Sequence, residues 1–302
     1  MNNRLGVVLL VTCWFAWGLS YPATKFALQS LDVWSSRALV MLAGGVVMLV
    51  LAALQGLSLK VPRAEWRDLF IAAMCNMAIF QMGMTYGVEL LSAGRTAVIV
   101  YTMPLWAALF AVPLLGERLT VARLAALALG LAGLAVLMSQ DFSHLRNAPL
   151  GALCTLVASI AFGLGTVWMK RRRWSADPTV LGGWQLMIGV APVLAIWALV
   201  APPVDPAQVS IDSWLAVLYL VLIANALAYF SWFRVVAIFP AIVSGIGAMA
   251  VPVVGVFASA ALLDERIGWR ELVALALICA ALAVNLTASA RGRPRPIMDK
   301  FS

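Results

Sequence analysis

Ten long runs of apolar residues occupy almost the whole of this 302-residue chain. They cover approximately residues 5–29, 33–55, 68–88, 93–115, 119–139, 150–170, 180–200, 214–234, 241–263 and 269–288. Because a helix of about 20 apolar residues crosses the hydrocarbon core of a bilayer, each run predicts one transmembrane helix. With 64% hydrophobic and 11% charged residues, a soluble protein of this length would leave too much apolar surface in water. The sequence therefore predicts an all-α polytopic membrane protein with short connecting loops.

The positive charges predict how the chain is oriented in the membrane. Ten spans place both termini on one side, and 15 of the 21 Lys and Arg residues fall on that side. Since cationic loops stay in the cytoplasm, we expect a multi-pass protein of a bacterial-type inner (plasma) membrane with both termini cytoplasmic. This topology explains the net charge of +8, so we do not expect nucleic-acid binding. A cleavable signal peptide is not expected, because Lys25 follows the first run in place of a small-residue cleavage site.

Residues 103–119 and 251–267 carry the same pattern, in which a proline-bearing apolar run ends in Glu-Arg before another apolar run begins. Both features recur at a spacing of 148 positions (104 to 252, 117 to 265). Because each half contains five spans, an odd number, the second half enters the membrane upside down. The sequence thus predicts two inverted five-helix repeats, at residues 1–140 and 141–290, followed by a basic cytoplasmic tail at 291–302. Transporters of this construction bind substrate between the repeats, near the midplane.

The two turns, Leu115-Gly116-Glu117-Arg118 and Leu263-Asp264-Glu265-Arg266, with the helices that flank them, resemble the paired EamA domains of the drug/metabolite transporter superfamily. The resemblance covers essentially the whole chain. It implies ten helices, cytoplasmic termini and export of small metabolites, and within the family the chain looks most like YddG-type exporters of aromatic and other amino acids. Asp264 replaces the glycine of the first turn. We expect the Glu-Arg pairs of these turns to cap helices and hold the loop geometry.

Aromatic and polar residues near the middle of the runs are the candidates for substrate binding. An amide or hydroxyl in lipid is unfavourable unless it has a partner or a function, and aromatic rings offer stacking surfaces. The alternative for each residue is ordinary packing or hydrogen bonding between helices. The candidates are Trp17, Tyr21, Asn76, Phe80, Tyr101, Phe162, Thr166, Asn225, Tyr229 and Ser244.

Pro104 and Pro252 are the candidate hinges. A proline within a helix removes one hydrogen bond and leaves the carbonyl four residues earlier, here Val100 or Ala248, in need of a partner. Such a carbonyl could bind a substrate ammonium. A purely structural kink, capped by Ser, Thr or water, is the alternative.

Charged side chains are expected to be absent from the middle of the membrane. All 13 acidic residues fall in loops or at the ends of runs, whereas carriers coupled to protons or sodium usually keep a carboxylate at the midplane. Lys25 and Arg37 lie near the outer ends of their runs, where we expect them to extend towards water. The sequence therefore predicts an uncoupled, facilitative carrier for net-neutral substrates, and a phosphate-sugar carrier is disfavoured because it would need a deep cation.

Catalysis and cofactor binding are not expected. The chain has one His, His144, and four scattered Cys residues, none with metal-ligand spacing. We expect no metal, no cofactor and no catalytic residues. The predicted function is alternating-access export of small neutral metabolites, above all amino acids, by a monomer or homodimer whose partners are the substrate and the lipid bilayer. Efflux of drugs or quaternary cations is the alternative, because aromatic walls also suit cations.

Overall fold

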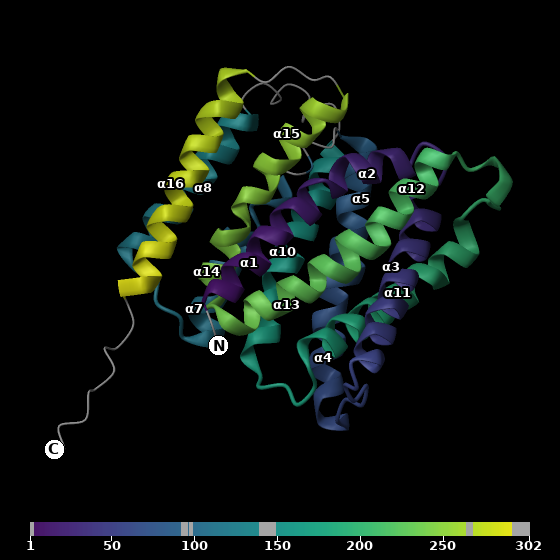
Figure 1. The fold of residues 1–302 in the computed structure, drawn as a ribbon, viewed down its shortest axis with the longest axis horizontal. Helices are drawn as coiled ribbons and strands as arrows, with labels where there is room; N and C mark the ends of the chain where they lie inside the picture. Colours follow the sequence, from purple (N-terminus) through teal and green to yellow (C-terminus); the bar gives the residue numbers. More distant parts are fainter. Residues whose placement is uncertain (1–2, 92–95, 97–98, 139–148, 264–267, 292–302) are drawn as a thin grey trace.

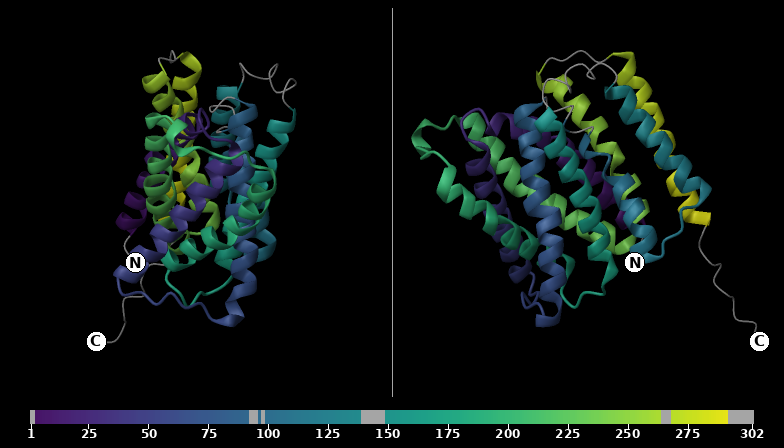
Figure 2. Two further views of the ribbon diagram at one scale, coloured as in Figure 1. Left: turned by 90° about the vertical axis from the view of Figure 1, so that its right-hand side faces the viewer. Right: turned by 180° about the vertical axis from the view of Figure 1, so that it is seen from behind.

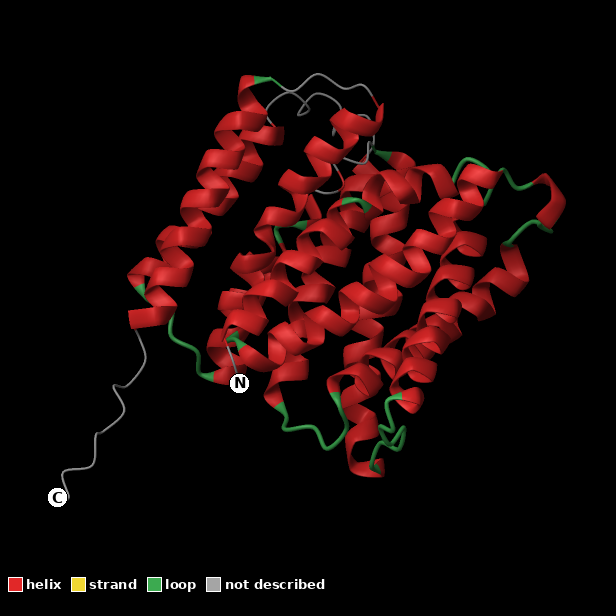
Figure 3. Ribbon diagram, in the orientation of Figure 1, coloured by secondary structure: helices red, strands yellow, loops and turns green. Residues whose placement is uncertain are grey.

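The computed structural model describes residues 3–91, 96, 99–138, 149–263 and 268–291. The turn at Asp264 to Arg266, the loop containing His144, the boundary between the predicted repeats and the tail beyond Arg291 lie outside these ranges. Within them the chain is helical apart from short loops, and no strand occurs (Figure 3). The prediction of an all-α polytopic membrane protein is confirmed.

The predicted spans correspond to helices as follows, several of them built from consecutive segments. They are α1 (Asn3–Gly18) with α2 (Ser20–Ala27); α3 (Val33–Leu54); η1 (Arg63–Glu65), α4 (Trp66–Ala73), η2 (Met74–Ile79) and α5 (Phe80–Leu90); α7 (Met103–Leu115); α8 (Val121–Met138); α10 (Pro149–Arg171); α11 (Pro178–Val200); α12 (Ile211–Tyr219), η4 (Leu220–Leu227) and α13 (Ala228–Ile238); α14 (Ala241–Gly247), η5 (Ala248–Ala250) and α15 (Val251–Leu263); and α16 (Trp269–Arg291). One further turn, η3 (Pro206–Gln208), lies in a loop. Six of these spans are long and apolar enough to cross a membrane, and four shorter apolar helices occupy the remaining positions.

Equivalent helices of the two predicted repeats pack against each other. α3, in the second span, lies along α11, in the seventh, and α8, in the fifth, lies along α16, in the tenth. The α8–α16 pair forms one side of the molecule, and the other spans form the main body (Figures 1 and 2). The start of α1 and the end of α16 lie at the same end of the bundle, which we call the inner end (Figure 1). The arrangement agrees with ten helices in two inverted repeats.

The third and eighth spans each contain a π-helical segment, η2 and η4. Each segment carries one asparagine, and each asparagine packs against a glycine of a neighbouring helix. A Cβ atom added at Gly165 would lie 2.1 Å from Oδ1 of Asn76, and one added at Gly44 would lie 2.8 Å from Cβ of Asn225. π-Helical turns occur frequently at functional sites, and here they bring polar side chains into the middle of the bundle.

The two proline-bearing spans are broken where the hinges are predicted. Pro104 is the second residue of α7, and η5 separates α14 from α15 just before Pro252. At the first break, Thr102 donates its hydroxyl proton to the carbonyl of Ile99, at 2.8 Å, and its Oγ1 lies 2.8 Å from Oγ of Ser159. The hydroxyl of Thr102 thus bonds to the carbonyl of Ile99 and not to that of Val100, and both the hinge role of the prolines and the alternative of a capped kink remain predictions.

Substitution of Gly189 by alanine should destabilise the contact between α11 and η2. The new Cβ atom would lie 2.4 Å from Cβ of Met77 and 3.2 Å from the amide nitrogen of Ala78, and neither atom can move without shifting the helix. Such overpacking costs about 1–3 kcal/mol. Thermal unfolding of the purified protein in detergent would measure the loss. Gly255→Ala is the control, because its nearest neighbour would be 3.3 Å away; equal melting temperatures of the two variants would contradict the prediction.

Candidate functional site

A narrow cavity, with a volume of about 30 Å³ open to a water-sized sphere, lies in the middle of the bundle, between helices of both predicted repeats. Seven of the ten candidate residues line it, from five different spans. The full lining is Trp17, Ser20, Tyr21, Arg37, Phe80, Gln81, Met84, Tyr101, Met103, Phe162, Leu220, Ala224, Asn225 and Tyr229. The side chains leave little of this space wide enough for a water molecule, so they must separate before a substrate can bind.

One wall of the cavity is aromatic and centres on Trp17. Its ring contacts those of Tyr229 and Trp232 at centroid distances of 5.5 Å and that of Phe162 at 6.2 Å. Phe80 extends the wall, with its centroid 4.5 Å from that of Phe162. Edge-to-face and tilted contacts at these distances are favourable for aromatic pairs. The rings come from four spans, so any relative motion of these spans changes the shape of the wall.

The orientation of Trp17 is set by a hydrogen bond to the π-helical segment η4. Its indole Nε1 donates to the carbonyl of Ala224 at 3.0 Å. The hydroxyl of Tyr219 in turn donates to the carbonyl of Ala16 at 2.9 Å. These two bonds tie the first span to the eighth and hold the indole against the cavity.

Next to the aromatic wall, Gln81 is the centre of a polar network that shares Tyr229 with it. Its amide Nε2 donates to Oδ1 of Asn225 at 2.9 Å and approaches the hydroxyl of Tyr229 at 3.4 Å. Its Oε1 accepts a hydrogen bond from Nη1 of Arg37 at 3.3 Å, and Nη2 of Arg37 donates to Oγ1 of Thr24 at 3.5 Å. The network joins the first, second, third and eighth spans, so the cavity lining combines polar groups with aromatic rings.

The position of Arg37 corrects the sequence analysis. The expectation that this side chain extends to water near the outer end of its span is wrong, because Arg37 is only 1% exposed and lines the cavity. The expectation that charged side chains are absent from the middle of the membrane is therefore wrong for this arginine. The apolar run shows how far along the span the residue lies but not which way it faces. The flexible stem of arginine carries the guanidinium inward to Gln81.

Three candidates lie away from the cavity lining. Asn76 donates through Nδ2 to Oε1 of Gln185 at 2.9 Å, and Gln185 approaches the sulfur of Met169 at 3.4 Å. The hydroxyls of Thr166 and Ser244 are buried without a partner. For Asn76 the structure thus shows the alternative role, hydrogen bonding between helices.

Arg37 and Gln81 are the functional candidates that the sequence analysis missed. Gln81 follows Phe80 in an apolar run, and the argument applied to buried asparagine amides applies equally to this glutamine. The sequence indicated a binding role for Arg37 less clearly, because a cationic residue near the end of an apolar run is usually exposed to water. Among the described residues, no three His, Cys, Asp or Glu side chains lie close enough together to hold a metal ion.

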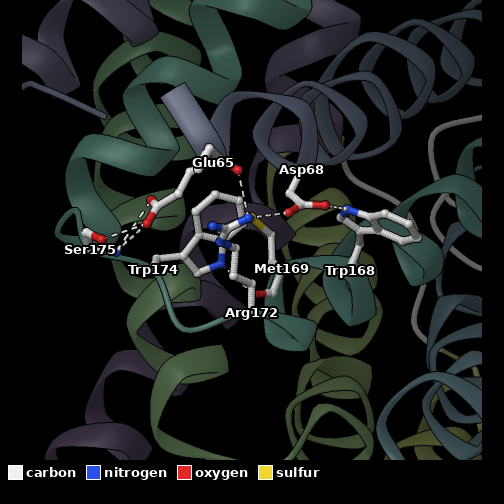
Figure 4. A network of polar contacts seen from close by, with 8 residues as sticks. Glu65, Asp68, Trp168, Met169, Arg172, Trp174 and Ser175 are labelled. Carbon is white, nitrogen blue, oxygen red and sulfur yellow. Dashed lines mark hydrogen bonds and ion pairs between the residues drawn. The ribbon is translucent and has the colours of Figure 1, made fainter. Parts of the chain in front are cut away.

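Polar contacts join the predicted repeats at the inner end of the bundle. Asp68 pairs with Arg172 at 2.7 Å and accepts a hydrogen bond from the indole of Trp168. Glu65 accepts hydrogen bonds from the backbone amide and the hydroxyl of Ser175 (Figure 4). These contacts hold the start of the third span to the loop between α10 and α11. They lie outside the lining of the central cavity and are structural.

A second inner contact, which we call the inner latch, comprises Glu117 and Lys170. The carboxylate of Glu117 accepts from the amides of Ala241, at 2.8 Å, and Ile242, at 3.4 Å, at the start of α14. The ammonium of Lys170 donates to the carbonyls of Val236 and Phe239 at the end of α13. Glu117 therefore caps a helix, as its turn predicts, but a helix of the other repeat.

Comparison with known proteins agrees with this fold. A model of the EamA-like transporter family matches residues 4–139 and 149–287. The chain is 25% identical over 278 residues to the uncharacterized transporter YoaV of Bacillus subtilis, covering 91% of this chain and 94% of that one. It is 27% identical over 307 residues to a probable amino-acid metabolite efflux pump of Escherichia coli, covering 95% and 96%. A solved crystal structure superposes with a TM-score of 0.81 at 21% identity, covering 97% of this chain and all of that one. The chain belongs to the EamA-like transporter family.

Proposed function

We propose that this protein exports amino acids across the bacterial inner membrane by alternating access. The observation that carries the proposal is the central cavity, whose lining combines aromatic rings with a network of amide and hydroxyl groups. A zwitterion with an apolar side chain fits such a cavity, because its charged end requires polar partners and its side chain can stack on rings. Two relatives at 27% identity bear the name probable amino-acid metabolite efflux pump.

We further propose that the inner end faces the cytoplasm and that transport is uncoupled. Cationic residues concentrate at the inner end, which favours a cytoplasmic position for both termini. Proton coupling needs a group that gains and loses a proton, and the charged side chain in the cavity lining is a guanidinium, which stays protonated. An imposed pH gradient should therefore leave the transport rate in proteoliposomes unchanged while the substrate gradient is kept constant.

Efflux of quaternary cations receives support from the aromatic wall, since rings attract cations. Arg37 argues against it, because a buried guanidinium repels a cation that enters the same cavity. Counterflow with labelled amino acids and with cationic dyes separates the two functions. Exchange of dyes without exchange of amino acids would reverse our choice.

Substitution of Trp17 or Tyr101 by alanine should impair amino-acid transport. Both side chains line the cavity, and loss of a stacking ring weakens binding by about tenfold, or roughly 1.4 kcal/mol. Counterflow in proteoliposomes, with each of the twenty amino acids in turn, measures the loss. Trp269→Ala is the control, because Trp269 is 64% exposed at the start of α16. Wild-type rates in both cavity variants would remove these residues from the site, and no exchange of any amino acid would refute the proposed function.

A further inference from the structure

We propose that Arg37 is the docking group for a carboxylate on the transported molecule, an assignment that rests on the proposed transport function and specifies its substrate class. The required substrate carries one carboxylate and an apolar or aromatic body. An ammonium group is not required. Three observations support this assignment: the missing countercharge of Arg37, the absence of a partner for its Nε and the composition of the surrounding cavity.

Arg37 is a buried cation without an anionic partner in the described part of the chain. Its hydrogen-bond partners are the neutral Oε1 of Gln81 and Oγ1 of Thr24. Arg172 and Arg234 are more exposed, yet each pairs with an aspartate, at 2.7 Å and 3.6 Å. Breaking a buried ion pair by removing one partner is strongly destabilising. An uncompensated charge kept in this position is therefore expected to have a function.

The edge of the guanidinium formed by Nε and Nη2, which is buried and in which Nε lacks a partner, suits a carboxylate once the cavity opens. Nε of Arg37 has no partner, and the hydrogen bond from Nη2 to Oγ1 of Thr24 is long, at 3.5 Å. Arginine binds a carboxylate best through two parallel N–H groups, which both oxygen atoms accept. The Nε and Nη2 groups provide such a pair. Nη1 meanwhile remains anchored to Gln81, which holds the plane of the guanidinium in place.

The rest of the cavity defines the remainder of the substrate. Arg37 is the single charged residue in the lining, so the site can balance one negative charge. A phosphate near its second pKa carries between one and two charges and would lack a second cation here. The aromatic wall of Trp17, Phe80 and Phe162 provides the surface for an apolar group. The site therefore favours a monocarboxylate over a phosphate or an amine.

Competition experiments on the intact protein in proteoliposomes test this substrate class. Labelled L-phenylalanine is exchanged in the presence of unlabelled 3-phenylpropionate, phenylalaninamide, phenethylamine or inorganic phosphate. We expect 3-phenylpropionate to compete as phenylalanine does, and the other three to require at least about tenfold higher concentrations. Equal competition by phenethylamine, or by inorganic phosphate, would overturn the assignment of a carboxylate site.

Variants of Arg37 separate a binding role from a structural one. Arg37→Lys keeps the positive charge but loses the two parallel N–H groups of the guanidinium, so we expect exchange to continue with a raised KM for carboxylates. In Arg37→Met we expect exchange of carboxylates to fall by at least about tenfold, while the melting temperature stays at or above that of the wild type, because an uncompensated charge is removed. Arg172→Met, which leaves Asp68 unpaired, is the matched control and should lower the melting temperature.

The outcomes distinguish this assignment from the proposed function. If no amino acid is exchanged, the proposed function fails, and the assignment is then tested with labelled 3-phenylpropionate against phenethylamine as the exchanged molecules. Exchange of 3-phenylpropionate that depends on Arg37 would support the assignment alone. Wild-type exchange of carboxylates in Arg37→Met, or exchange confined to molecules without a carboxylate, would overturn it.

Discussion

Replacement of Gln81 by glutamate is expected to abolish the transport of carboxylates and to raise the melting temperature of the protein. The new carboxylate would occupy the position of Oε1, which lies 3.3 Å from Nη1 of Arg37. It would supply the countercharge that the buried guanidinium lacks. Removal of one partner from a buried ion pair costs about 3–5 kcal/mol, and the reverse change should recover part of this energy. Because the internal carboxylate would compete with the substrate for Arg37, affinity should fall by roughly 100-fold or more.

The matched control for this variant is Gln185→Glu. Gln185 is also a buried amide between helices, but its partners, Asn76 and the sulfur of Met169, are neutral. A carboxylate there would be desolvated without a cationic partner, so the melting temperature should fall. Counterflow of labelled phenylalanine and thermal unfolding would be measured for both variants. A destabilised Gln81→Glu protein, or one with wild-type transport, would contradict the placement of Arg37 at the binding site.

Glu117→Ala is expected to loosen the contact between the predicted repeats at the inner end. The substitution removes the acceptor for the first two amides of α14 and the negative charge at its N-terminus. Loss of such a cap costs about 0.5–2 kcal/mol, equivalent to roughly a 2- to 30-fold change in an equilibrium constant. Amide hydrogen exchange at residues 241–247, measured by mass spectrometry, should accelerate by a factor within this range. Because Glu117 belongs to one predicted repeat and α14 to the other, the contact between them should be formed for a smaller fraction of the time.

Two control variants complete this test: the conservative change Glu117→Gln and the removal of a different helix cap, Asp32→Ala. Glu117→Gln keeps an acceptor oxygen but loses the charge, so exchange in α14 should lie between that of the wild type and that of Glu117→Ala. Asp32 caps α3 through the amides of Trp34 and Ser35, at 2.9 and 3.1 Å, within one repeat. Asp32→Ala should therefore leave exchange in α14 unchanged. Equal exchange in α14 for the wild type and Glu117→Ala would show that the latch does not hold the inner end.

Much of the candidate site could be located from the sequence. A deep aromatic residue in an apolar run, such as Trp17 or Phe162, is recognisable because runs of membrane length reveal depth directly. The duplicated pattern around Pro104 and Pro252 identified the spans that are broken near the centre. Depth alone does not separate residues that line the cavity from those that pack elsewhere. Asn225 faces the cavity, whereas Asn76, in the corresponding segment of the other repeat, bonds to Gln185.

The amino-acid sequence by itself determined the fold class, the ten spans and the inverted repeat, because burial of about 20 apolar residues per span leaves a helix across the bilayer as the available structure. Only the tertiary structure decided that Arg37 points inward to Gln81 and that Glu117 caps a helix of the opposite repeat. These contacts join residues 44 and 124 positions apart. They depend on which faces of the helices meet. In a membrane the lipid tails are as apolar as the protein interior, so the pattern of hydrophobic residues says little about which helix face is buried.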